Sequence, residues 1–180
     1  NIQLNSKILG DISSIDAYKN SKYQCLFNTE SQLYLIDRNG KNVDNFPILL
    51  PSNTKVGHSL FDYNNTRKYR ILILGDENNI YNLDKKGKKI KGWKYEKNNN
   101  RINKKLQNFR VGNKDYILAE RNNSNTQLLA INGSERVKFE QGIQFNGNPI
   151  RLDKNGTLYN ITSEGKLWRG TLDGNSSQLT

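Results

Sequence analysis

Residues 23–40 read YQCLFNTESQLYLIDRNG, and residues 70–87 read RILILGDENNIYNLDKKG. When one is set over the other without a gap, the two stretches match at a central glutamate, a turn aspartate and the closing glycine. Gly40 then falls on Gly87, which lies 47 residues later. An internal repeat of this length decides the fold class before other features do, because each copy must form the same structural unit.

The repeat extends beyond these two copies. Upstream, residues 15–23 (IDAYKNSKY) parallel residues 61–69 (FDYNNTRKY) with a slip of one residue. A third, weaker copy covers residues 115–133, and a fourth covers residues 149–165. The closing glycines are 47, 46 and 32 residues apart. We therefore expect the fourth copy to have lost about one strand together with its loop.

Each copy reads as short strands joined by polar turns. Turns of the form Asp-x-x-Gly, in which aspartate caps the turn and glycine supplies a positive φ, are expected at 37–40, 84–87 and 153–156. The run at 71–74 (ILIL) is apolar on both alternating faces, which predicts a strand buried on both sides. The mixed run at 88–95 (KKIKGWKY) predicts an outer, half-exposed strand.

A period of roughly 40–50 residues built from about four strands is the signature of a β-propeller among known repeats. We predict an all-β fold of β-propeller-like repeats with about three to four blades, forming a single domain or a partial propeller over residues 1–180. The approximate blades are 9–50, 55–97, 102–141 and 143–175.

The edges of a partial propeller need a cover, because unpaired strands promote aggregation. Either residues outside this chain complete the ring, or a second copy docks onto it. The sequence contains no methionine, even at position 1, which favours the first alternative.

The chain is polar, but its composition is not that of a disordered protein. Apolar residues make up 34 % of it, against roughly 45–50 % in a typical domain. Nine Tyr, six Phe and two Trp argue against disorder, since disordered chains are poor in aromatic residues. No run approaches the roughly 18 apolar residues of a membrane helix, so we expect no transmembrane segment in this stretch.

The net charge of +11 comes from 28 Lys and Arg against 17 Asp and Glu. Such an excess would suit nucleic acid, lipopolysaccharide or a phospholipid surface. However, the charges are scattered through every segment, which favours an ordinary solvated surface. We do not expect nucleic acid as a partner, and we expect a protein or a glycan.

Strand-and-turn motifs occur at residues 22–48, 60–65, 69–70, 87–93, 109–112 and 115–117. These segments resemble the C-terminal propeller-like region of large uncharacterised envelope proteins of Bacteroidetes-type bacteria. The resemblance covers roughly residues 1–140 and is carried by strand-and-turn motifs. It implies secretion or anchoring in the cell envelope, periplasm or surface, and it supplies no catalytic residues. More distantly, the blade pattern is similar to quinoprotein-type propellers, without their cofactor-binding set.

The chain has a single cysteine and a single histidine. Cys25 lies in an apolar, strand-like run with no histidine near it in sequence, so we expect a buried, unreactive thiol. His58 begins an expected inner strand, where a structural or pore-lining role is more common than a catalytic one. We predict no catalytic residue, no metal ligand and no cofactor.

Residues 62–67 (DYNNTR) place oxygen-bearing side chains at alternate positions, Asp62, Asn64 and Thr66, as calcium loops do. The glycine and the distal bidentate carboxylate of such a loop are missing, and basic residues follow. We therefore expect a turn here and no metal site.

The densest basic segment begins at Lys85 and interleaves lysines with two aromatic residues. Stacking rings beside lysines could bind an anion or a partner. Equally, lysines protect an exposed edge strand against aggregation, and a solvated edge is the simpler interpretation. The residues of this possible patch are Lys88, Lys89, Lys91, Trp93, Lys94, Arg101, Lys104 and Lys105.

Together these features favour a non-enzymatic binding or scaffold propeller of the bacterial cell envelope. One alternative is the ligand- or quinone-binding propeller domain of an enzyme, which a single histidine disfavours. Another is a structural segment of a larger protein with no ligand of its own. Fold alone does not choose among them, because one fold hosts many functions.

Overall fold

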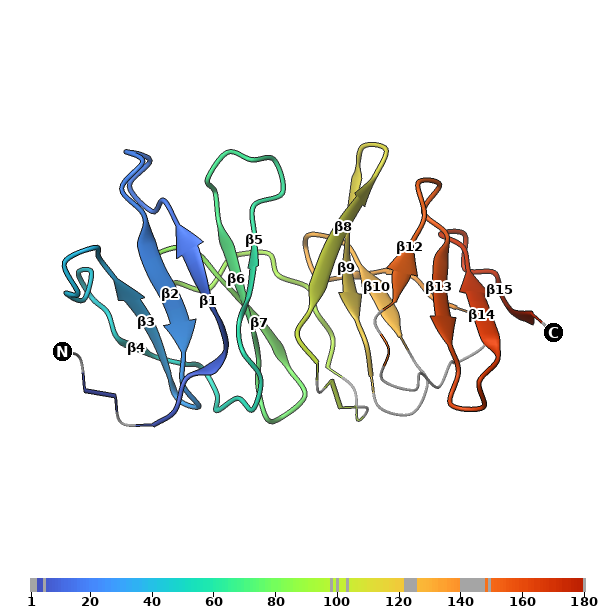
Figure 1. Cartoon of the computed structure of the whole chain (residues 1–180), viewed down its shortest axis with the longest axis horizontal. Coiled ribbons are helices and arrows are strands. Elements are labelled where there is room, and N and C mark those ends of the chain that lie inside the picture. The colour runs from blue at the N-terminus through green and yellow to red at the C-terminus, as the bar shows by residue number, and fades with distance from the viewer. Residues whose placement is uncertain are drawn as a thin grey trace. The chain divides into compact units, whose positions relative to one another are not determined.

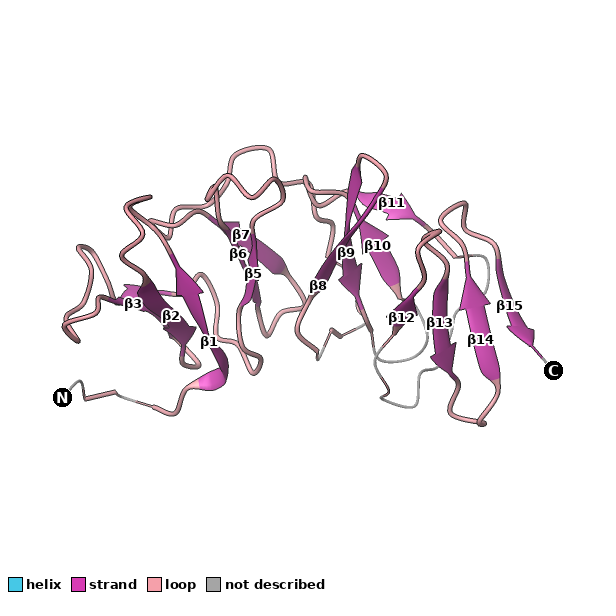
Figure 2. Cartoon of the chain, turned by 45° about the horizontal axis from the view of Figure 1, so that its top comes forward, coloured by secondary structure: helices cyan, strands magenta, loops and turns pink. Residues whose placement is uncertain are grey.

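The structure is a computed structural model that describes residues 3–4, 6–97, 99, 101–102, 104–121, 126–139, 148 and 150–179. This part of the chain forms fifteen strands in four antiparallel sheets and contains no helix (Figures 1 and 2). It accordingly has no helix that could cross a membrane. The chain divides into two compact units, Asn1–Trp93 and Lys94–Thr180.

The first unit holds a four-stranded sheet, in the order β1-β2-β3-β4, and a three-stranded sheet, in the order β5-β6-β7. Every strand pairs with its neighbour in sequence, so each sheet is a meander. The strands are β1 (Leu9–Ile15), β2 (Gln24–Asn28), β3 (Gln32–Ile36), β4 (Ile48–Leu49), β5 (Ser59–Phe61), β6 (Arg70–Leu74) and β7 (Ile80–Leu83).

The second unit holds two four-stranded meanders, β8 to β11 and β12 to β15. Four-stranded antiparallel meanders are the form of propeller blades, so the predicted all-β, propeller-like class is confirmed. The strands are β8 (Gln107–Val111), β9 (Lys114–Ala119), β10 (Gln127–Leu129), β11 (Glu135–Val137), β12 (Arg151–Leu152), β13 (Leu158–Ile161), β14 (Leu167–Gly170) and β15 (Ser176–Leu179).

The fourth copy of the repeat is complete, and the prediction that it had lost a strand is wrong. Strands β12 to β15 form a full meander. They are only two to four residues long, and four-residue turns such as Thr162–Gly165 and Thr171–Gly174 join them. The step of 32 residues is short because Gly165 closes the second turn of this sheet, between β13 and β14, whereas Gly133 closes the third turn of its own sheet, between β10 and β11. The structural counterpart of Gly133 is Gly174, which lies 41 residues later (174 − 133 = 41).

The expected outer strand at 88–95 is also wrong. This segment makes one isolated bridge, between Lys89 and Leu83, and then turns at Gly92, which has a φ of 76°. Glycine adopts this left-handed conformation without steric cost, and that conformation interrupts the extended backbone that a strand needs. The second sheet therefore has three strands.

Alternating apolar residues form the core of each unit. In the first unit, the buried side chains of Ile15, Leu26, Leu35, Ile71 and Ile73 join the two sheets. All four residues of the ILIL run in β6 are buried, which confirms the prediction of a strand covered on both faces. In the second unit a separate core cluster comprises Tyr116, Leu118, Leu128, Val137, Leu158 and Trp168.

The Asp-x-x-Gly turns form as predicted. The amide of Gly40 donates to the Asp37 carbonyl at 3.0 Å, and Gly40 has a φ of 75°. The Asp37 carboxylate accepts from the amides of Lys41 and Asn39, both at 2.9 Å. These bonds, led by that from Lys41, lower the pKa of Asp37 against a smaller opposing effect of burial.

The thiol of Cys25 is exposed, and the prediction that it is buried is wrong. Along β2, Gln24 is buried and Cys25 points to the other face. Gln24 accepts a hydrogen bond from the amide of Ala17 at 2.9 Å, so a polar residue fills the inner position. Strand alternation then places the thiol on the opposite face of β2, which it shares with Phe27.

Candidate binding surface

The meander order gathers loops that are distant in sequence at one end of the first unit. Successive connections of a meander alternate between its two ends. The β1–β2 and β5–β6 connections and the turns after β3 and β7 therefore share one end, and the two connections rise at the top of Figure 1. We call this the basic loop end, and it comprises residues 16–23, 37–41, 62–69 and 84–88.

Charge is segregated between the two ends of this unit. The basic loop end carries nine Lys and Arg against four aspartates. The connections at the opposite end, residues 29–31, 50–58 and 75–79, carry one lysine against three acidic residues. The nine cations are Lys19, Lys22, Arg38, Lys41, Arg67, Lys68, Lys85, Lys86 and Lys88.

The four aspartates of the basic loop end are engaged within their own loops. Each carboxylate accepts hydrogen bonds from two backbone amides a few residues further along the chain. At least one oxygen of each carboxylate is thus turned toward the backbone, while seven of the nine cations are exposed. This end also exposes two aromatic rings, Tyr18 at 55 % and Tyr23 at 53 %. The resulting surface combines positive charge with flat rings.

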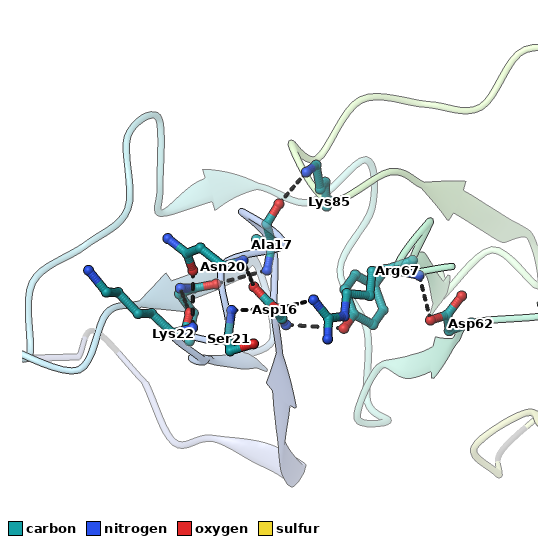
Figure 3. A network of polar contacts seen from close by, with 10 residues as sticks. Asp16, Ala17, Asn20, Ser21, Lys22, Asp62, Arg67 and Lys85 are labelled. Carbon is teal, nitrogen blue, oxygen red and sulfur yellow. Dashed lines mark hydrogen bonds and ion pairs between the residues drawn. The ribbon is translucent and has the colours of Figure 1, made fainter. Parts of the chain in front are cut away.

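A buried carboxylate joins the loops of the two sheets (Figure 3). Asp16 is fully buried, and its Oδ2 lies 2.7 Å from Nη1 of Arg67. The same carboxylate accepts from the amides of Asn20 at 3.0 Å and Ser21 at 2.9 Å. The Asp16 amide donates to the Tyr69 hydroxyl at 3.1 Å. We call this cluster the Asp16 clasp, because it ties the β1–β2 loop to the β5–β6 loop.

The upstream half of the sequence repeat is a repeated loop conformation. Lys19 and Ser21 have φ values of 57° and 61°, and their counterparts Asn65 and Arg67 have 51° and 58°. Asp62 accepts from the Thr66 and Arg67 amides as Asp16 does from its own loop. The two loops differ at the position of Ser21. The second loop has Arg67 there, and its guanidinium contacts the Asp16 carboxylate of the first loop.

The pKa of Asp16 gives the stability of this unit a defined pH dependence. Burial raises it, but hydrogen bonds from the Ser21 and Asn20 amides and the charge of Arg67 together lower it below its usual value. A carboxyl whose folded pKa is depressed stabilises the fold above its unfolded pKa, and this contribution is lost as the pH falls through the folded value.

We therefore expect the thermal midpoint of the chain to fall as the pH drops below about 4, the unfolded value for aspartate. Asp37, Asp153 and Asp173 also have lowered pKa values and act in the same direction. Circular dichroism melts at a series of pH values measure the effect, and the Asp16→Asn variant should show a shallower fall. An equal fall in both proteins would contradict the assignment to Asp16.

The predicted basic patch is divided between the two units. Lys88, Lys89, Lys91 and Trp93 belong to the first, whereas Lys94, Arg101, Lys104 and Lys105 belong to the second. Of the eight, Lys88 lies in the basic loop end. The structure therefore brings one of these residues together with the cations of other loops.

Several members of the predicted patch make internal contacts. The Trp93 indole donates to the Ile80 carbonyl at 2.7 Å. The ammonium of Lys89 lies 5.2 Å from the centre of the Tyr81 ring. In the second unit, Lys104 pairs with the Glu120 carboxylate at 2.6 Å. These side chains contribute to the fold of their own units.

His58 and Asp62 have structural contacts. The His58 ring is buried, with Nε2 2.8 Å from the Ser13 hydroxyl and Nδ1 3.2 Å from Oδ1 of Asn28. These contacts link the start of β5 to the first sheet. Asp62 caps its own loop, and no cluster of three or more His, Cys, Asp or Glu able to hold a metal occurs among the described residues.

The second unit contains a cavity of about 290 Å³. Residues 94–97 form one wall, and strand β10 with the β10–β11 turn forms the other. The Lys94 amide donates to the Asn132 carbonyl at 2.7 Å, which fixes the first wall beside the turn. Sequence reasoning missed this site, because residues 94–97 and 127–135 come together only in three dimensions.

No protein-family model and no curated protein matches this chain. Solved structures show its fold instead. BBS1N, crystallised in complex with ARL6DN, superposes with a TM-score of 0.64 at 13 % identity, and BamB from Moraxella catarrhalis with 0.60 at 14 %. Both are β-propeller proteins. The extracellular domain of the hybrid two-component system BT3049 from B. thetaiotaomicron superposes with 0.54 at 16 %.

These likenesses cover nearly the whole of this chain but only part of the other proteins. They span 97 %, 95 % and 98 % of this chain, and 56 %, 52 % and 23 % of BBS1N, BamB and the BT3049 domain respectively. The chain thus spans about half the length of the two propeller proteins. At this level of identity the comparison shows the fold and leaves function to be argued from the surface.

Proposed function

We propose that the chain is part of a non-enzymatic binding or scaffold propeller of the bacterial cell envelope, and that the basic loop end receives an anionic protein or glycan. The observation that carries this proposal is the segregation of nine cations to one end of the first unit. Clustered positive charge steers anionic partners and raises their rate of association.

The surroundings of these cations support binding rather than simple solvation. The four aspartates at the same end are bonded to backbone amides, so they compete weakly for the neighbouring lysines. Tyr18 and Tyr23 add exposed rings, which are enriched in binding surfaces. The Asp16 clasp holds the loops that carry these groups, so the surface is ordered before binding.

The placement in the envelope rests on resemblance. The strand-and-turn motifs are similar to envelope proteins of Bacteroidetes-type bacteria, and the BT3049 domain of related fold is extracellular. An enzymatic ligand-binding domain is the weaker alternative, because His58 is buried in structural contacts.

Charge reversal tests the proposal. The triple variant Lys19→Glu, Lys22→Glu, Lys68→Glu should bind polygalacturonate or polyglutamate at least about tenfold more weakly than wild type at low salt, because three exposed contacts become repulsive. Biolayer interferometry against the immobilised polymers measures this. The preferred polymer indicates a glycan or a protein partner.

A matched control separates the surface from the net charge. The variant Lys114→Glu, Lys138→Glu, Lys154→Glu changes three exposed lysines of the second unit and has the same net charge as the test variant. It should bind almost as wild type does. If both triple variants lose binding equally, the basic loop end is not the binding surface.

A further inference from the structure

We propose that the cavity of the second unit is a site for a single neutral sugar unit, either free or at the end of a glycan. It uses other residues than the basic loop end, so either site can be disproved without the other. Three features of the cavity support this site: its polar groups, their charge balance and its size.

A continuous hydrogen-bond network holds the polar groups of the cavity. Arg121 is 6 % exposed, and its guanidinium donates to the Tyr95 hydroxyl at 2.8 Å and to Oε1 of Gln127 at 3.1 Å. The Gln127 amide then donates to Oε1 of Glu135 at 2.9 Å. Tyr95, Gln127 and Glu135 all line the cavity, so the buried arginine fixes their positions before a ligand arrives.

The partial burial of Tyr95 agrees with this arrangement. Burial raises the pKa of its hydroxyl, although the nearby charge of Arg121 and its hydrogen bond act in the opposite direction. The phenol therefore stays protonated at neutral pH. It accepts a hydrogen bond from Arg121, which fixes the phenol oxygen at the wall of the cavity.

The charges of the lining are balanced. The cavity is lined by two positively charged residues, Lys94 and Lys97, and by two negatively charged residues, Glu96 and Glu135. A neutral ligand with many hydroxyl groups suits such a site, because each hydroxyl both donates to a carboxylate and accepts from an ammonium. The Tyr95 ring and the Leu129 side chain supply apolar surface for the C–H face of a pyranose ring.

The size of the cavity agrees with one sugar unit. A volume of about 290 Å³ corresponds to about ten water molecules at roughly 30 Å³ each, and a hexose has a comparable number of non-hydrogen atoms. The volume lies near the lower limit for small-molecule sites, which is about 300 Å³. A complete oligosaccharide would have to extend out of the cavity into solvent.

Saturation-transfer NMR on the whole chain tests this site, with D-glucose, D-galactose, D-mannose and N-acetyl-D-glucosamine as probes. We expect at least one to bind saturably, with a Kd near 1 mM. Glu135→Gln and Tyr95→Phe should each weaken it by about tenfold, the effect of one lost hydrogen bond. The control Glu164→Gln, on the exposed β13–β14 turn of the same unit, should bind as wild type does.

The outcomes divide clearly. A trisaccharide that ends in the sugar that binds is then compared with that sugar alone. Tighter binding of the trisaccharide supports a terminal glycan unit, and equal affinity of the two supports a free sugar. The proposal would be overturned if none of the four sugars bound saturably, or if glycine or glutamate bound saturably and the sugars did not. Unchanged sugar affinity in both cavity variants would also overturn it. Circular dichroism of the variants checks that the fold is intact.

Discussion

Replacing Asp16 with alanine is expected to lower the thermal midpoint of unfolding by about 5 °C or more. The substitution removes the carboxylate that two backbone amides and the Arg67 guanidinium share. It empties a fully buried position and leaves three partly buried donors without their acceptor, which costs more than the loss of an exposed contact.

The repeat supplies a matched control for this variant. Asp62 occupies the corresponding position of the second loop and accepts from the Thr66 and Arg67 amides. It is partly exposed, whereas Asp16 is fully buried. Asp62→Ala should therefore lower the midpoint by a smaller amount.

Differential scanning calorimetry of the two variants and of Arg67→Gln measures these effects. If the contact with Arg67 is important, Asp16→Ala and the double variant Asp16→Ala, Arg67→Gln should have similar thermal midpoints. The second substitution then removes an interaction that the first has already removed. Equal effects of Asp16→Ala and Asp62→Ala would show that capping of the loops, rather than the clasp between them, stabilises the unit.

Gly57→Val should be more damaging, with an expected loss of about 3 kcal/mol of unfolding free energy, at the upper end for overpacked sites. A Cβ at Gly57 would lie 2.8 Å from the Gly10 Cα and 2.8 Å from the Leu9 carbonyl oxygen. Both are backbone atoms, so no side chain can move aside. The β4–β5 connection packs closely against the start of β1 here because neither glycine has a side chain.

Urea denaturation followed by tryptophan fluorescence measures this loss. Gly40→Ala serves as the control, because Gly40 has a positive φ but its Cβ would meet no atom within 4 Å. It should cost only about 1 kcal/mol, the strain of the left-handed conformation. If Gly57→Val were no worse than Gly40→Ala, the close packing of the β4–β5 connection against β1 would not be important for stability.

Much of the fold follows from the sequence, because it depends on local patterns. The Asp-x-x-Gly turns form since aspartate bonds to the amides two and four residues ahead and glycine adopts the positive φ. The alternation of apolar residues in β6 likewise predicts burial on both faces. Where a local pattern was ambiguous, as at Cys25 and residues 88–95, the prediction was wrong.

The candidate sites depend on the tertiary structure. The charges look scattered along the chain, yet the meander brings every second connection of the first unit to one end and so collects nine cations there. The cavity of the second unit likewise joins Tyr95 to Gln127 and Glu135.

By itself, the sequence determined the repeat, the turns and the all-β class, because these follow from hydrogen bonds and burial over a few neighbouring residues. Only the tertiary structure decided which loops share an end, which carboxylate meets Arg67 and which glycines touch. Strand pairing sets these distances between residues far apart in the chain, and a linear pattern does not contain them.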